Sequence, residues 1–132
     1  MNLHKYLLKS MVAIVFISDF AIAQSPKNYG EQMNLPSPLN KANSAGEYLA
    51  ACVAATLAFE STAKGTNFDT KEARIWGGTV LRAKDQFPDP NFDGWIKKWF
   101  DQLKKAQPAY NKIYFERCKR DFPNPKNTGY VR

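Results

Sequence analysis

The sequence predicts an all-α fold, a small four-helix bundle-like domain closed by one disulfide. Four segments carry apolar residues at helical spacing, and the connections between them are short and polar. No segment shows the alternation of apolar and polar residues that indicates a strand. The two cysteines, Cys52 and Cys118, fall in the first and last of the four segments. We therefore expect one helical domain over residues 44–122.

The first residues have the pattern of a signal peptide. Lys5 and Lys9 precede the apolar stretch Met11–Ser18, and Ala21-Ile22-Ala23 is an A-x-A cleavage site. The stretch is shorter than the ~20 residues that a membrane span requires, although an uncleaved anchor is the alternative. We expect residues 1–23 to be removed and the mature protein to reside in the periplasm without stable membrane insertion.

The composition of the mature chain excludes several kinds of catalytic site. Removal of residues 1–23 leaves 109 residues with 17 basic and 11 acidic side chains, a net charge of +6. The single histidine, His4, lies in the signal, so Ser-His-Asp, Cys-His and His-bearing zinc sites are excluded. The positive charge favours an acidic partner, and export argues against nucleic acid as that partner. We expect no metal, no cofactor and no enzymatic activity.

Residues 24–43 contain three prolines, one glycine and four asparagines without an apolar period. This composition predicts an extended N-terminal arm. The first helix then begins with Ser44 and Glu47, which fit the S-x-x-E capping box. It should span about residues 45–63, and its alanine-rich faces predict that other helices surround it.

The second helix should span about residues 70–86, opened by a capping box of Asp69 and Glu72. Gly77-Gly78 in its middle costs helix stability, so we expect a close helix crossing or a kink at this pair. A rigid turn follows over residues 88–94, because prolines interrupt helices and Asn and Asp favour turns.

Two further helices complete the domain. One spans about residues 94–107, with aromatic and aliphatic residues on one face and lysines on the other. The next begins at Pro108, carries Tyr110, Tyr114 and Cys118 on its apolar stripe, and ends before Pro123. Residues 123–132 form a polar C-terminal tail.

The pairing of Cys52 with Cys118 follows from compartment and count. Disulfides persist in exported proteins, and two cysteines fit one bridge. The alternative is a reactive thiol, for which Cys118 between Arg117 and Lys119 is the better candidate. The small apolar neighbours of Cys52 argue for a structural sulfur.

Carboxylates offer a second route to catalysis. Asp85, Asp89 and Asp93 cluster around the turn, and Glu60 or Glu116 could supply an acid. A glycosidase needs two facing carboxylates, one of them desolvated, and no apolar run places such a pair. A carboxylate-dependent, muramidase-like enzyme is therefore an alternative to a binding protein.

Aromatic and basic residues alternate along the third helix and predict a face that binds an acidic protein partner. The stiff turn beside it is suited to insertion into a cleft, because a rigid loop loses little entropy on binding. The predicted partner-binding residues are Asp89, Asn91, Phe92, Asp93, Trp95, Lys97, Lys98, Lys104 and Lys105.

The layout resembles one known family. The export signal, the cysteine in "LAACVAATLAF" and the cysteine in "YFERCKRDF" are similar to those of periplasmic immunity proteins that neutralise peptidoglycan-amidase effectors of the type VI secretion system. The resemblance covers roughly residues 44–122, and the chain departs from it in Lys119-Arg120-Asp121-Phe122, where the family has a histidine-containing stretch. It implies a helical, often homodimeric, non-enzymatic inhibitor of an effector or toxin enzyme.

The functional prediction is an immunity-type periplasmic inhibitor that blocks a secreted cell-wall-degrading effector. An envelope accessory or chaperone subunit of a secretion or conjugation apparatus is the alternative within the class of binding proteins. Both hypotheses require a protein partner and neither requires a catalytic residue.

Overall fold

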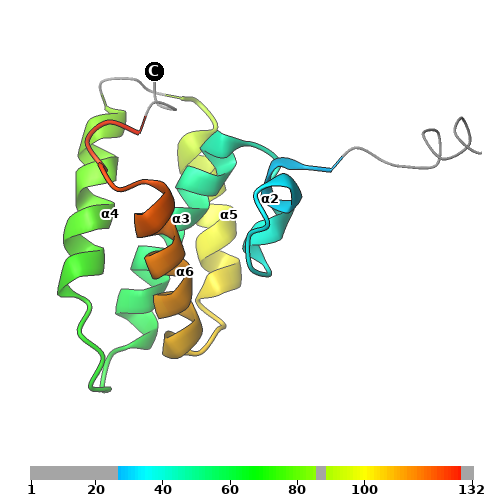
Figure 1. The fold of residues 1–132 in the computed structure, drawn as a ribbon. Helices are drawn as coiled ribbons and strands as arrows, with labels where there is room; N and C mark the ends of the chain where they lie inside the picture. The colour runs from blue at the N-terminus through cyan, green and yellow to red at the C-terminus, as the bar shows by residue number, and fades with distance from the viewer. Residues whose placement is uncertain (1–26, 86–88, 129–132) are drawn as a thin grey trace, which may run out of the picture.

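The structure is a computed structural model, and it describes residues 27–85 and 89–128. Within these ranges the chain is all-helical and has no strand, which confirms the predicted fold class. The elements are α2 (Tyr29–Gln32), the 3₁₀ helix η1 (Leu39–Lys41), α3 (Ala45–Thr62), α4 (Lys71–Lys84), α5 (Phe92–Leu103) and α6 (Pro108–Asp121). The four long helices form one compact bundle (Figure 1). The predicted signal peptide lies outside the described residues.

α3 is the central helix, as its alanine-rich sequence predicts. It packs against α4, α5 and α6, and it is buried on nearly every side. Leu57 is the large apolar side chain of α3 that remains exposed. Small side chains allow three neighbouring helices to approach one axis closely, so the alanines make this central position possible.

Gly77 allows α4 to lie close to α3. A Cβ atom at Gly77 would overlap the hydroxyl oxygen of Thr56, which is buried in α3. The predicted close crossing is therefore confirmed at Gly77. A Cβ at Gly78 would meet only the far end of Arg82 at 3.5 Å, so the crossing does not explain the second glycine.

The two predicted capping boxes differ in the structure. Ser44 Oγ accepts a hydrogen bond from the Glu47 backbone N–H at 3.1 Å, which is the expected half of the first box. The second box does not form. Thr70 is the N-cap of α4 and provides no side-chain cap, and the carboxylate of Glu72 instead accepts a hydrogen bond from Lys119 of α6 at 2.9 Å.

α5 begins earlier than predicted and α6 buries a shifted stripe. Phe92 is the first residue of α5, so the helix includes the last three residues of the predicted turn. On α6 the exposed fraction of both Tyr110 and Ile113 is 55%, and the buried stripe consists of Asn111, Tyr114, Phe115 and Cys118.

The prediction of an extended arm over residues 24–43 is wrong for its described part. Residues 28–43 contain α2 and η1, and the side chains of Leu35, Leu39 and Ala42 are buried in the core. A Cβ at Gly30 would overlap the backbone of Asn40, so a glycine is needed where these two turns meet. The segment folds because it docks on other helices, which a local composition cannot indicate.

Candidate functional site

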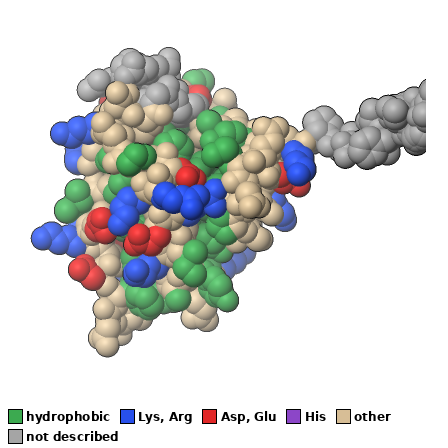
Figure 2. Space-filling model, in the orientation of Figure 1, with side chains coloured by type: hydrophobic (Ala, Val, Ile, Leu, Met, Phe, Trp, Pro, Cys, Tyr) green, Lys and Arg blue, Asp and Glu red, His purple; other side chains and the backbone are tan. Residues whose placement is uncertain are grey.

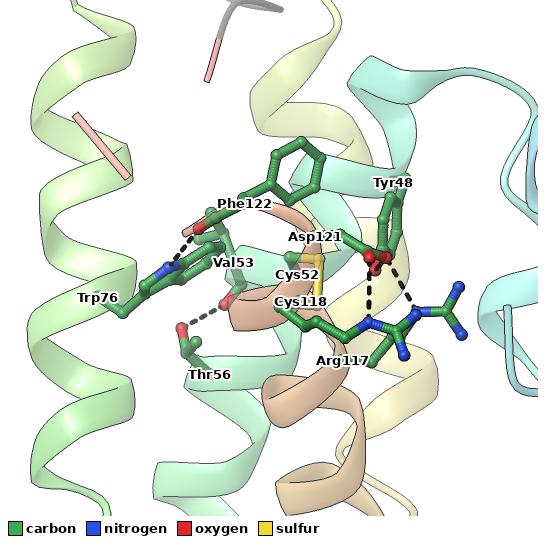
Figure 3. The surroundings of a disulfide bond; sticks show 10 residues. Tyr48, Cys52, Val53, Thr56, Trp76, Arg117, Cys118, Asp121 and Phe122 are labelled. Carbon is green, nitrogen blue, oxygen red and sulfur yellow. Dashed lines mark hydrogen bonds and ion pairs between the residues drawn. A yellow bond between two sulfur atoms is a disulfide. The ribbon is translucent and has the colours of Figure 1, made fainter. Parts of the chain in front are cut away.

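The disulfide between Cys52 and Cys118 joins α3 to α6 in the interior. Its Cα atoms are 5.7 Å apart, and neither cysteine has any exposed surface. Figure 3 shows Tyr48 and Trp76 on either side of the bridge. A thiolate nucleophile must be partly exposed, so this bridge is structural and the alternative of a reactive thiol is not supported.

A polar network beside the disulfide fastens the N-terminal segment to α6. Asp121 accepts hydrogen bonds from Tyr48 Oη at 2.7 Å and Arg117 Nε at 2.9 Å (Figure 3). Burial and the hydrogen bond to Asp121 raise the pKa of the Tyr48 hydroxyl well above its usual value. Arg117 also donates to the backbone oxygens of Met33 and Asn34. The contacts of this network connect α3, α6 and the N-terminal segment, so we assign it a structural role.

The outer face of α5 is the best candidate for a binding surface. We define it as the exposed side chains from Lys97 to Lys105, that is, the end of α5, its C-cap Lys104 and the next residue, and it carries four lysines and one aspartate. All four lysine side chains are exposed, and that of Lys97 is 79% exposed. Asp101 lies between them and forms ion pairs with Lys97 at 3.3 Å and Lys104 at 3.4 Å. The nearby lysines hold the pKa of the Asp101 carboxyl below its usual value.

The face visible in Figure 2 has a different balance of charge. Positive and negative side chains lie beside one another across it. On α6, Lys112 pairs with Glu116 at 3.7 Å, and Lys119 pairs with Glu116 at 3.2 Å and Glu72 at 2.9 Å. Lys105, which lies just after α5, in contrast forms no ion pair with any residue that the structure describes.

The structure corrects one predicted partner-binding residue and limits another. Phe92 is 1% exposed and packs in the core, so it cannot contact a partner directly. Its position at the start of α5 turns the side chain inward, onto the same buried face as Trp99 and Leu103. Trp95 is partly buried against the core and offers only part of its ring to solvent.

The polar residues before and within the first turn of α5 lie at the surface. Asn91 and Asp93 are exposed, and Asp93 forms an ion pair with Lys84 of α4 at 2.6 Å. Asp89 is half-buried, and its carboxylate accepts a hydrogen bond from the Asn91 backbone N–H at 2.8 Å. These contacts fix the entry into α5. Pro88 of the predicted turn lies outside the described residues.

Glu47 has a structural role beyond the helix cap that the sequence predicts. The carboxylate is buried in α3 and accepts hydrogen bonds from Lys98 Nζ at 2.6 Å and Trp99 Nε1 at 2.9 Å, both on α5. Asn43 donates a third from its backbone N–H at 3.2 Å. Burial raises the pKa of Glu47, but these hydrogen bonds and the charge of Lys98 outweigh it, and the pKa lies below its usual value.

The contacts of Glu47 connect the core of the bundle to the outer face of α5. Lys98 therefore has a structural partner as well as an exposed stem, and its side chain is 54% exposed. A spacing of 51 residues separates the two partners, so no local pattern could have indicated the pair.

Glu60 and Glu116, the two glutamates proposed as catalytic acids, each form an ion pair. Glu60 lies 3.6 Å from Arg74, and its side chain is 39% exposed. Glu116 lies within 3.7 Å of Lys112, and its side chain is 46% exposed. Exposed carboxylates beside cations differ from the desolvated acid that a glycosidase requires. Asp85 is also exposed.

Residues 27–85 and 89–128 contain no cluster of three or more His, Cys, Asp or Glu side chains that could hold a metal ion. Among the helices described here, none is both long and apolar enough to cross a membrane. Family models, curated proteins and solved structures were compared with the chain, and none of them matches it.

Proposed function

We propose that this protein is a periplasmic, immunity-type inhibitor that binds a secreted cell-wall-degrading effector through the outer face of α5. The observation that carries the proposal is the exposed lysine-rich face of a helix whose opposite side is fixed in the core.

The disulfide supports an oxidising compartment such as the periplasm. A buried bridge between α3 and α6 must form during folding, and the cytosol keeps thiols reduced. The predicted cleavage site after Ala23 precedes α2, which begins at Tyr29. Removal of the predicted signal peptide would therefore leave every described helix intact.

The anchoring of α5 favours binding without rearrangement. Phe92, Trp99 and Leu103 are buried along one side of the helix, and Glu47 binds Lys98 and Trp99 from α3. A surface held in one conformation loses little entropy when it binds, so its contacts contribute more fully to affinity.

The charge of this face selects an acidic surface as its partner. Lysines at the rim of an interface accelerate association with a negatively charged protein and discriminate against other partners. The partly exposed ring of Trp95 adds an aromatic contact of the kind found at interface centres. An acidic region around the active-site cleft of a toxin would fit this surface.

Charge reversal on α5 tests the proposal. The candidate effectors are the products of the genes beside this one, each produced in the periplasm with and without the protein. We expect the wild type to prevent lysis and the double variant Lys97→Glu/Lys105→Glu to fail, with at least a hundredfold weaker binding, because two attractive contacts become repulsive. Growth and isothermal titration calorimetry provide the two measurements.

The double variant Lys64→Glu/Lys71→Glu is the matched control, because it reverses two exposed lysines away from α5. It should protect cells as the wild type does. Equal loss in both variants, or full protection by the α5 variant, would exclude this surface. Lysis of cell-wall substrate by the purified protein would favour the muramidase hypothesis, and copurification with secretion machinery alone would favour the accessory subunit.

A further inference from the structure

A small hollow on α4 lies apart from the α5 face. It has a volume of about 220 Å³ and is lined by Thr79, Arg82, Ala83 and Lys126. Thr79 lies on α4 one turn before Arg82 and Ala83, and Lys126 comes from the segment after α6. α4 and α5 lie on opposite sides of α6 in Figure 1, so this hollow belongs to a second region of the surface.

The position of Lys126 follows from contacts that bind the C-terminal segment to the bundle. Trp76 Nε1 of α4 donates a hydrogen bond to the backbone oxygen of Phe122 at 3.2 Å (Figure 3). A turn follows, in which Asn124 Oδ1 accepts from the Lys126 backbone N–H at 3.2 Å, and Asn124 O accepts from the Asn127 N–H at 3.1 Å. This turn brings a cation from the end of the chain to the side of α4.

Both cations of the hollow lack an anionic partner within residues 27–85 and 89–128. The guanidinium of Arg82 donates to the hydroxyl oxygen of Thr79 at 3.4 Å and forms no ion pair there. The ammonium of Lys126 forms none either. Arg74 and Lys84 on the same helix differ, since each has a carboxylate partner, Glu60 and Asp93 respectively.

The geometry points to a binding site for one compact anionic group, a carboxylate or a phosphate, held between Arg82 and Lys126. Arg82 has five N–H donors in a planar fork that matches either oxyanion, and Thr79 fixes one edge of that fork. Lys126 supplies a second positive charge from the facing segment.

The size of the hollow limits the ligand. A water molecule occupies about 30 Å³ in the liquid, so 220 Å³ holds a small anion with a few waters. Drug-sized ligands occupy larger pockets, of about 300–1,000 Å³. Ala83 is the apolar residue of the lining. This inference does not depend on the function proposed for α5.

Anion titration followed by two-dimensional ¹H–¹⁵N NMR tests the site. The probes are inorganic phosphate and the dicarboxylate glutarate, each added to the purified, oxidised protein at constant ionic strength set with chloride. We expect saturable shifts of the backbone amides of Thr79, Arg82, Ala83 and Lys126. Saturation by phosphate at the lower concentration identifies a phosphoryl ligand, and saturation by glutarate at the lower concentration identifies a carboxylate.

Three variants separate a defined site from general attraction to a basic protein. Arg82→Gln and Lys126→Gln should each weaken binding about tenfold, since each removes a charge-assisted hydrogen bond. Arg74→Gln removes the same charge from α4 and should leave binding unchanged. Shifts that do not saturate with either anion, or equal weakening by Arg74→Gln and Arg82→Gln, would overturn the proposal. The NMR spectra themselves show whether each variant is folded.

Discussion

α3 and α5 lie in contact, and the sequence of each suits its position in the bundle. α3 is rich in alanine, whereas α5 contains two tryptophans and two lysines. α3 is surrounded by helices and is buried along nearly its whole length. α5 buries one side and exposes the other, where Lys97 and Lys98 lie within the helix and Lys104 and Lys105 lie directly after it. The sequence of α3 is therefore constrained by packing on all sides, whereas half of α5 is free to meet a partner.

The contrast between α3 and α5 separates residues that stabilise the fold from residues that are available for binding. Substitutions that disturb the contacts of α3 should unfold the protein, because a close-packed interior tolerates few changes of volume. Substitutions on the outer face of α5 should change binding and leave the free energy of unfolding nearly unaltered. Glu47 is the exception that connects the two helices, since it lies in α3 and binds α5.

Among substitutions in α3, removal of the disulfide should cause the largest loss in the free energy of unfolding. The bridge joins residues 66 positions apart, and in the chain-entropy model such a loop contributes about 4 kcal/mol to stability. We expect the double variant Cys52→Ala/Cys118→Ala to lose this amount in urea unfolding followed by circular dichroism. A loss below about 1 kcal/mol would contradict the structural role of the bridge.

Removal of the Glu47 carboxylate should have the next largest effect. Glu47→Ala leaves Trp99 Nε1 and the Asn43 N–H without their acceptor, and we expect a loss of about 3 kcal/mol in urea unfolding. Glu60→Ala is the matched control, because its exposed pair with Arg74 should contribute no more than about 0.5 kcal/mol. Similar losses in the two variants would show that burial does not distinguish them.

The same carboxylate predicts a dependence of stability on pH. Because the pKa of Glu47 in the folded protein lies below its ordinary value of 4.5, the charged form stabilises the fold. This contribution is fully present above pH 4.5 and is lost as the pH falls through the lowered pKa. The stability difference between wild type and Glu47→Gln should therefore be constant from pH 7 to 5 and shrink below pH 4. If the stability difference between wild type and Glu47→Gln grows on acidification, the pKa of Glu47 is raised in the folded protein, and the prediction is wrong.

The two adjacent glycines of α4 distinguish the side of that helix facing α3 from the side facing away. Gly77→Ala places a methyl group against Thr56 and should cost about 2 kcal/mol, as overpacked cores do. Gly78→Ala places a methyl group in ordinary contact with the far end of the Arg82 side chain and should raise stability by about 0.5–1 kcal/mol, because alanine favours helix. Thermal unfolding of the two variants measures the contrast, and effects of the same sign would refute it.

Neutral substitutions on the outer face of α5 should have the smallest effect on folding. Lys97→Ala and Lys105→Ala should each change the free energy of unfolding by less than about 0.5 kcal/mol, since both side chains are exposed. Chemical denaturation measures this directly. A loss above about 1 kcal/mol would mean that this face contributes to the fold and is not reserved for a partner.

Much of the helical core could be predicted from local patterns. The alanine-rich sequence of α3 and its Ser44 cap are visible within one helix, and the pairing of Cys52 with Cys118 follows from compartment and count. The close approach at Gly77 was also predictable, because glycine within a helix needs a packing reason. These features arise from neighbours in the sequence or from a constraint on a single residue.

The features that escaped prediction depend on distant contacts. Residues 28–43 lack a period, yet they fold because Leu35 and Leu39 enter the core and Arg117 binds the backbone at Met33. Glu47 looked like a capping residue, and its partners lie 51 and 52 positions away. Phe92 was predicted to bind a partner, but it is buried in the core by contacts that its local sequence does not indicate.

Lysine footprinting of the complex with the adjacent-gene effector tests the role of α5 most directly. The protein is labelled with an amine-reactive reagent with and without the effector, and mass spectrometry quantifies each site. We expect protection of Lys97, Lys98, Lys104 and Lys105, with Lys64 and Lys71 labelled equally in both samples. Protection of Lys64 and Lys71 while the α5 lysines remain fully reactive would contradict it.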